Sequence, residues 1–177
     1  PTSGMIDITL TATAGENFGT LGTLTFSNIV VPSTEIVSWS NNQIIFKCPA
    51  GIGTSHQVVV TSNGNAFTAA QLFSYQAPVL TAISPNTGPQ TGNTAVTLTG
   101  ENFGNSSSPI TVMVGGLPGI NATWVNPTTI TFNTPAGYGQ DVNVIVTMAG
   151  QSSNALAFNY ATTGSVGIGT NNPSNFL

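Results

Sequence analysis

Charged side chains are almost absent from this sequence of 177 residues: Asp, Glu, Lys and Arg make up only 3% of it, and Lys47 is its single Lys or Arg. An average globular domain carries about 25% charged residues. Proteins bind nucleic acid by neutralising several phosphates with Lys and Arg, so nucleic acid is excluded as a partner. The hydrophobic fraction is 40% and the net charge only −4, whereas disordered chains combine low hydrophobicity with high charge. We therefore expect a folded protein.

Long apolar runs are also missing. No stretch approaches the about 18 apolar residues that indicate a transmembrane helix, and no basic amphipathic segment is present to lie on a membrane surface. The sequence therefore predicts no membrane span. It opens at Pro1, without Met and without a signal-peptide pattern. We expect this start to be a processed end or a fragment boundary, from which a targeting segment has been removed.

Cysteine occurs once, at Cys48, so an intrachain disulfide is excluded. An unpaired cysteine in a secreted protein can instead link two chains. The local pattern argues against that, because alternation places Ile44, Phe46 and Cys48 on one face of a strand and Lys47 on the other. We predict that Cys48 is a small side chain of the core.

An internal repeat organises the chain. Gly15-Glu16-Asn17-Phe18-Gly19 recurs 85 residues later as Gly100-Glu101-Asn102-Phe103-Gly104. Further landmarks follow in the same order at offsets of 85 or 86: Trp39 and Trp124, 49–53 and 135–139, 58–61 and 144–147, and Phe73/Tyr75 and Phe158/Tyr160. Such a repeat indicates duplication. We predict a first domain over 1–77, a second over 78–161 and a C-terminal extension over 162–177.

The hydrophobic period within each copy is two residues, which is typical of strands. In the second copy we expect strands at 94–99, 110–114, 128–133, 142–148 and 155–160, separated by Gly, Pro, Asn and Ser. Short strands at this spacing predict an all-β fold of two antiparallel sandwiches. The predicted core is Val96, Leu98, Phe103, Val112, Val114, Trp124, Ile130, Phe132, Val144, Val146 and Phe158, with Trp39, Ile44, Phe46, Val58, Val60 and Phe73 in copy one.

The second copy resembles the IPT/TIG family of immunoglobulin-like domains. The resemblance rests on 79–88 and 96–104, and is supported by 135–137 and the closing Phe158-Asn159-Tyr160. The family is known from plexins, some transcription factors, bacterial surface proteins and polysaccharide-degrading enzymes. Its members bind proteins or DNA, or space other domains, so the resemblance implies a fold but does not select a function.

Copy one departs from the family pattern at its start. Residues 1–4 align with 85–88, so copy one has no equivalent of 79–84, the expected first strand of copy two. We therefore expect its sandwich to be one strand short. A missing strand exposes apolar core and unpaired backbone, which is a template for another strand.

The C-terminal extension offers a candidate for that strand. Val166 and Ile168 alternate with glycines, and Asn171 to Pro173 read as a turn. The segment resembles a Val-Gly-Ile-Gly-Thr-x-x-Pro-Ser motif of phage tail fibres and bacterial surface proteins. One hypothesis is that Val166 and Ile168 belong to a strand donated to the first domain of the next subunit, which would build a filament. The alternative is a fragment whose first strand has been cut off, with the extension as a linker.

Catalytic and metal-binding patterns are scarce. His56 is the single imidazole, no nucleophile-elbow motif accompanies it, and a solvated turn residue is the simpler interpretation. Glu16 and Glu101 occupy the same place in both copies, which favours a structural turn over a calcium site. Zinc prefers clusters of Cys and His, and the chain has one of each. We predict no catalytic residue, no metal site and no cofactor.

Glycan chemistry has three candidate positions. Asn105 and Asn121 lie in N-glycosylation sequons. Tyr138 is the main aromatic candidate for stacking on a sugar, since both Trp residues repeat between the copies and are expected in the core.

Together these features predict a non-enzymatic extracellular structural protein, a subunit of a surface filament or fibre assembled head to tail, whose main partner is a second copy of itself. The alternative is an adhesin segment, or an accessory module of a larger secreted protein that binds surface glycans or other surface proteins.

Overall fold

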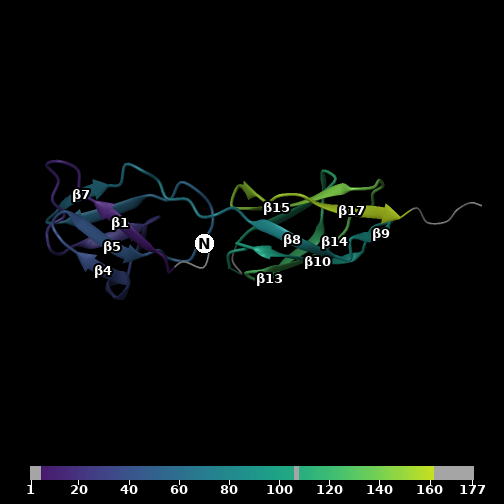
Figure 1. The fold of residues 1–177 in the computed structure, drawn as a ribbon, viewed down its shortest axis with the longest axis horizontal. Coiled ribbons are helices and arrows are strands. Elements are labelled where there is room, and N and C mark those ends of the chain that lie inside the picture. Colours follow the sequence, from purple (N-terminus) through teal and green to yellow (C-terminus); the bar gives the residue numbers. More distant parts are fainter. Residues whose placement is uncertain (1–4, 106–107, 162–177) are drawn as a thin grey trace, which may run out of the picture.

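Two β-sandwiches follow one another along the chain (Figure 1). The computed structural model describes residues 5–105 and 108–161. The all-β prediction is confirmed, since the described residues contain strands and one 3-10 turn, η1 (Ser33–Glu35). None of these residues forms a helix long and apolar enough to cross a membrane. The predicted extension, with Val166 and Ile168, lies outside the described residues.

The first sandwich contains two antiparallel sheets. One has the order β1-β5-β4 and the other β3-β2-β6-β7. Their strands are β1 (Asp7–Thr11), β2 (Thr23–Phe26), β3 (Ile29–Val30), β4 (Ile36–Trp39), β5 (Gln43–Lys47), β6 (Val58–Ser62) and β7 (Asn65–Thr68). The alternation of β5 directs Ile44 and Phe46 inward beside Cys48, and all three are buried. The predicted burial of Cys48 is thus confirmed.

The second sandwich has the sheets β13-β14-β10-β8 and β12-β11-β15-β17-β9, with β16 attached to β15. Its strands are β8 (Val79–Ser84), β9 (Thr87–Pro89), β10 (Ala95–Glu101), β11 (Ile110–Val114), β12 (Leu117–Pro118), β13 (Ile120–Asn126), β14 (Thr129–Asn133), β15 (Val142–Met148), β16 (Gln151–Ser152) and β17 (Leu156–Ala161). The strands expected over 110–114 and 142–148 match β11 and β15, and the other three differ by one or two residues at their ends.

Each sandwich has its own core, and most predicted core residues are buried. Three predictions need correction, because Trp39, Trp124 and Phe73 are half-buried and pack against the cores from outside. The indole N–H of Trp39 donates to Phe18 O at 3.3 Å, and that of Trp124 donates to Phe103 O at 2.9 Å. A Trp N–H needs such a partner, and each ring finds it in a carbonyl outside the strands, so both indoles stay half-buried.

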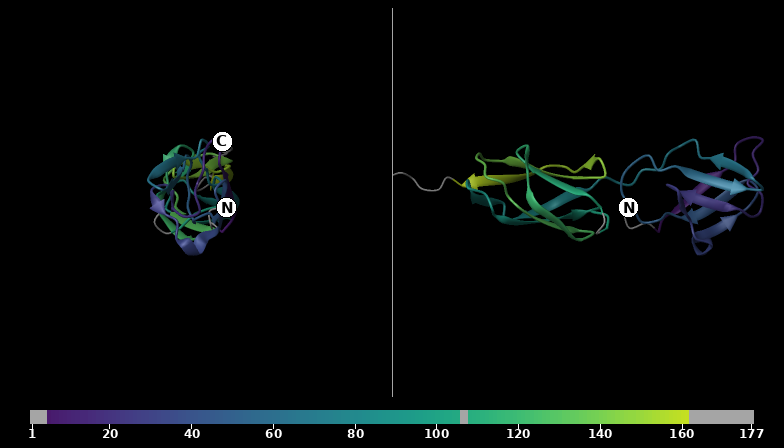
Figure 2. Two further views of the ribbon diagram at one scale, coloured as in Figure 1. Left: turned by 90° about the vertical axis from the view of Figure 1, so that its left-hand side faces the viewer. Right: turned by 180° about the vertical axis from the view of Figure 1, so that it is seen from behind.

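The two sandwiches lie end to end and in line (Figures 1 and 2). Ile52 of the first packs against the core of the second. Two hydrogen bonds flank this contact: Gln151 Nε2 donates to Tyr75 O at 3.0 Å, and Asn102 Nδ2 donates to Ala77 O at 3.2 Å. The domain junction therefore combines apolar packing with bonds to the linker backbone.

Candidate functional site

The candidate site is the outer edge of β1. In the second domain, β10 pairs with β14 on one side and with β8 on the other. In the first domain, β1 pairs with β5, and no other described strand lies against it. Because Ala12 N–H donates to Asn42 O on the β5 side, antiparallel alternation directs the backbone polar groups of Thr9 and Thr11 to the opposite side. Within the described ranges these groups form an unpaired strand edge.

The hydrogen bonds of the two domains establish which residues correspond. Ala12 N–H donates to Asn42 O, and Gly100 N–H donates to Thr128 O, both at 2.9 Å. Leu10 lies opposite Ile44 in the first domain just as Leu98 lies opposite Ile130 in the second. Two residues earlier in each strand, Ile8 lies opposite Phe46 and Val96 lies opposite Phe132. Ile8, Leu10 and Ala12 therefore occupy the places of Val96, Leu98 and Gly100.

Burial differs sharply at these matched positions. Val96 and Leu98 are 1% and 0% exposed, whereas Ile8 and Leu10 are only half-buried. The difference lies in β8, which covers the second domain and inserts Leu80, 3% exposed, into its core. The first domain thus exposes apolar surface at the place that β8 fills in the second.

A groove of about 330 Å³ runs beside this edge, and we call it the acceptor groove. Its apolar lining consists of Leu10, Phe18, Val58, Val60, Phe67, Ala69 and Ala70. Four threonines, Glu16 and Gln71 complete the lining. An extended segment with an apolar side chain on one face matches this surface in shape and chemistry, because backbone pairs with β1 and the side chain enters the groove.

The second domain also shows how such a strand is held. Leu80 N–H donates to Asn154 Oδ1 at 2.8 Å, and Asn154 Nδ2 donates to Leu80 O at 3.0 Å. The positions in the first domain that align with Asn154 at offsets of 86 and 85 are Thr68 and Ala69. The acceptor groove has no amide clamp at that place, so an incoming strand depends on β1 and on apolar packing.

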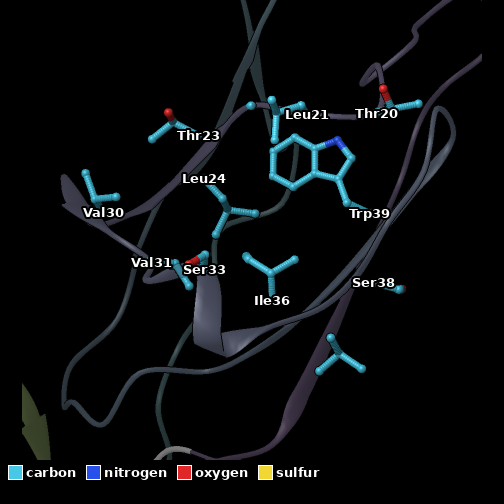
Figure 3. A pocket seen from close by; sticks show the side chains of 12 residues that line it. Thr20, Leu21, Thr23, Leu24, Val30, Val31, Ser33, Ile36, Ser38 and Trp39 are labelled. Atoms are coloured by element: carbon cyan, nitrogen blue, oxygen red, sulfur yellow. The ribbon is translucent and has the colours of Figure 1, made fainter.

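A second hollow of about 480 Å³ lies between β2, β3 and β4 (Figure 3). Leu24 and Ile36 face the ring of Trp39 across it, and Leu21, 82% exposed, stands at its margin. The polar lining consists of backbone and of Ser and Thr hydroxyls, with no charged side chain. Since the indole N–H is already bonded to Phe18 O, this pocket offers mainly apolar contact.

His56 does not lie in solvent, which corrects the expectation of a solvated turn residue. Its Nδ1 lies 2.6 Å from Ser27 Oγ and its Nε2 lies 2.9 Å from Ile52 O. The ring stacks on Phe26 with centroids 5.5 Å apart. Both nitrogens have partners and the ring is half-buried, so the residue braces the turn behind Ile52. Sequence periodicity had no means of showing this, because Ser27 and Phe26 are about 30 residues away along the chain and Ile52 O is a backbone acceptor in a turn.

Cys48 and Tyr75 form a buried polar pair. The Cys48 thiol lies 3.7 Å from Tyr75 Oη, and that hydroxyl donates to Pro49 O at 2.7 Å. Burial raises the pKa of both groups, and for Tyr75 the contact with Cys48 raises it further. A thiol held in its protonated form is a poor nucleophile, so this pair stabilises the fold and supplies no reactive group.

The remaining candidate residues stand apart. Glu16 accepts hydrogen bonds from Thr13 Oγ1 at 2.6 Å and Thr13 N at 3.0 Å, and these bonds lower its pKa. No group of three His, Cys, Asp or Glu gathers as a metal site in the part of the chain that the structure describes. Asn105 and Asn121 are exposed, and their glycosylation stays a prediction. Tyr138 is 84% exposed beside Leu117.

The fold defines the chain as a tandem pair of immunoglobulin-like sandwiches. It belongs to the IPT/TIG domain family, which it matches over residues 1–75 and 78–160.

Among solved structures it is similar to the surface glycan-binding protein PbSGBP-B from Prevotella bryantii, with 19% identity over 84% of this chain and 35% of that one, at a TM-score of 0.53. It is also similar to the plexin A4 full extracellular region, domains 1 to 10, with 22% identity over 92% of this chain and 15% of that one, at a TM-score of 0.50. At these identities the likeness is one of fold. The chain spans only about a sixth to a third of these proteins.

Proposed function

We propose that the chain is a non-enzymatic structural subunit of an extracellular surface filament or fibre, in which copies assemble head to tail. The observation that carries this proposal is the outer edge of β1, which has no partner among the described residues while β10 in the second domain pairs on both sides. Open strand edges are normally shielded by charge, proline or a covering segment. This edge instead borders an apolar groove.

The low charge supports assembly. Charge keeps monomeric proteins soluble and apart, and a chain with 3% charged residues has little repulsion to overcome when copies meet. Heterologous contacts that do not close into a ring produce filaments. An extracellular place for the assembly is supported by the fold relatives, of which one is a surface glycan-binding protein and another an extracellular region.

Electron microscopy and light scattering of the purified chain test the proposal. We expect polymers whose length grows with concentration. Thr9→Pro removes a backbone donor that faces the open edge and leaves the β5-side bonds in place, so it should shorten the polymers strongly. Thr9→Val keeps the donor and is the matched control. Particles of 18.0 kDa at every concentration, or equal polymers from Thr9→Pro and Thr9→Val, would contradict the proposal.

A second candidate is a glycan-binding module or adhesin segment. It is favoured by Tyr138, whose ring is 84% exposed beside Leu117 and Val142, since exposed aromatic rings stack on sugars. Titration of the chain with a panel of polysaccharides tests this function. If the chain stays monomeric and binds a polysaccharide, and if Tyr138→Ala abolishes that binding, the glycan-binding function is favoured over the filament.

A further inference from the structure

At the junction between the two domains, the side chain of Ile52 packs directly against Gly104. Ile52 comes from the turn 49–53 of the first domain, and a Cβ built on Gly104 of the second would lie 2.4 Å from Ile52 Cγ2. Only a residue without a side chain allows this approach. Beside it, a Cβ on Gly53 would lie 3.2 Å from Ala149 Cβ. The glycine motif of the repeat thus has a packing role at this junction.

The turn that carries Ile52 has a copy at the far end of the second domain. Gly51 packs on the Tyr75 ring and Gly137 on the Tyr160 ring, each with a built Cβ 2.7 Å from the nearest ring atom. Tyr75 N–H donates to Gly53 O and Tyr160 N–H to Gly139 O, both at 2.9 Å. These matched contacts put Tyr138 in the place of Ile52.

The glycine has a copy as well, at the outer end of the first domain. Gly19 lies 85 residues before Gly104, and the two have φ values of +65° and +60°. Gly19 follows Phe18, whose N–H donates to Asn41 O as Phe103 N–H donates to Pro127 O. A Cβ built on Gly104 meets Ile52 of the other domain, whereas a Cβ built on Gly19 meets Ser62 Oγ at 2.7 Å and Asn63 Nδ2 at 3.1 Å of its own domain. One end of the chain therefore presents a protruding side chain, and the opposite end presents the matching glycine, bordered by these two polar side chains.

We propose that the junction between successive copies repeats the junction between the domains. Tyr138 of one copy packs on Gly19 of the next, and residues 162–177 of the first copy enter the acceptor groove of the second, as residues 76–84 enter the second domain within the chain. This inference rests on the proposed head-to-tail assembly and names its contacts. It also gives the exposed ring of Tyr138 a partner.

The direction of the chain fits this arrangement. β1 begins next to Cys48, close to the turn that faces the second domain, and runs to the outer end of the first. β10 likewise runs toward Asn102, which bonds the linker at Ala77. A segment that enters at the outer end thus meets β1 antiparallel, as β8 meets β10. β17 ends at the far end of the second domain (Figure 1), where the next copy would begin.

Length permits the connection. The linker and β8 use nine residues, 76–84, whereas 162–177 comprises sixteen. Sixteen extended residues span at most about 55 Å. To reach the groove of its own chain the segment would have to run back along the whole second domain, so a second copy is the occupant that this geometry favours.

One residue determines the register of the incoming strand. The pairing of β8 with β10 is irregular between Thr99 and Gly100, where a Cβ on Gly100 would lie 2.0 Å from Val79 O. This irregular pairing places Leu80 and Ile83, three positions apart, against the core. Ala12 replaces Gly100 in the first domain, and its Cβ excludes such an approach. A regular strand, with inward side chains two positions apart, fits instead. Val166 and Ile168 have that spacing.

Substitutions at Tyr138 test the junction in the full chain. Tyr138→Asp should raise the concentration needed for polymers by about tenfold or more, as expected for a buried interface aromatic, while the exposed position leaves the fold intact. Tyr138→Ile installs the residue of the internal junction and should stay within about threefold of the parent. Ile168→Asp should block polymers, with Ser174→Asp as its control.

The outcomes separate the two proposals. Polymers of Tyr138→Asp that match the parent overturn the junction and leave the filament in place. An equal loss of polymer formation in Tyr138→Ile and Tyr138→Asp also overturns the junction, because packing on glycine tolerates Ile whereas stacking on a sugar does not. Polymers of Ile168→Asp that match Ser174→Asp overturn the assignment of the segment. A parent chain that forms no polymer overturns the proposed function, and the junction with it.

Discussion

Replacing Gly100 with Ala tests whether β8 accounts for the difference between the two domains. The added Cβ would lie 2.0 Å from Val79 O and 2.6 Å from the Phe103 ring, so β8 must move by about 1 Å or more to relieve the contact. The φ of Gly100 lies outside the left-handed region, so the substitution adds a steric clash but no backbone strain. Overpacking costs about 1–3 kcal/mol, and a displaced β8 also exposes Leu80. We expect a loss of about 3 kcal/mol.

Calorimetry and hydrogen exchange measure this effect. A loss of about 3 kcal/mol lowers the melting temperature of a domain of this size by about 15 °C, and the amides of β8 should lose protection first. Ala12→Gly is the matched change in the first domain, and it should cost less than about 1.5 kcal/mol. If Gly100→Ala leaves the second transition and the protection of β8 unchanged, β8 does not account for the difference between the two domains.

Three further predictions concern stability and assembly. Tyr160→Phe removes the hydroxyl that donates to Pro135 O at 2.8 Å and should cost about 1–2 kcal/mol in urea unfolding, whereas Tyr138→Phe should cost nothing measurable. Burial raises the pKa of Cys48, Tyr75 and Tyr160 in the folded state, so these groups ionise first in the unfolded chain. The free energy of unfolding should therefore fall above about pH 9, a trend that pH-dependent melts would reveal and that Cys48→Ala should delay. Polymers should persist in 1 M NaCl, where the Debye length is about 3 Å; turbidity that disappears with salt alone would contradict assembly by backbone pairing.

Much of the fold was predictable because the repeat and the period of two are strong signals. Alternating β-branched residues located β11 and β15 correctly, since burial on one face of a strand leaves that pattern. β13 (Ile120–Asn126) was missed, because it is interrupted by register shifts and its residues are mostly exposed. The pattern that identifies a strand is lost when neither face is buried.

The site was only partly predictable. Alignment of the copies indicated a missing first strand, and the open side of β1 lies where that alignment places it. The correspondence of Ala12 with Gly100 was hidden, because the first domain has three extra residues between β1 and the Gly15 motif. The offset between matching residues is 88 in β1 and 85 at that motif, so only the strand pairing shows which residues correspond. The role of Tyr138 likewise needed the contact of Ile52 with Gly104, which only the structure supplies.

A high-resolution structure of the assembled polymer is the decisive experiment, because it identifies the segment that lies beside β1. We predict an antiparallel strand from residues 162–177 of a neighbouring copy, with Val166 and Ile168 turned into the acceptor groove. An edge that stays unpaired in the polymer, or that is filled by a segment of the same chain, would contradict the account.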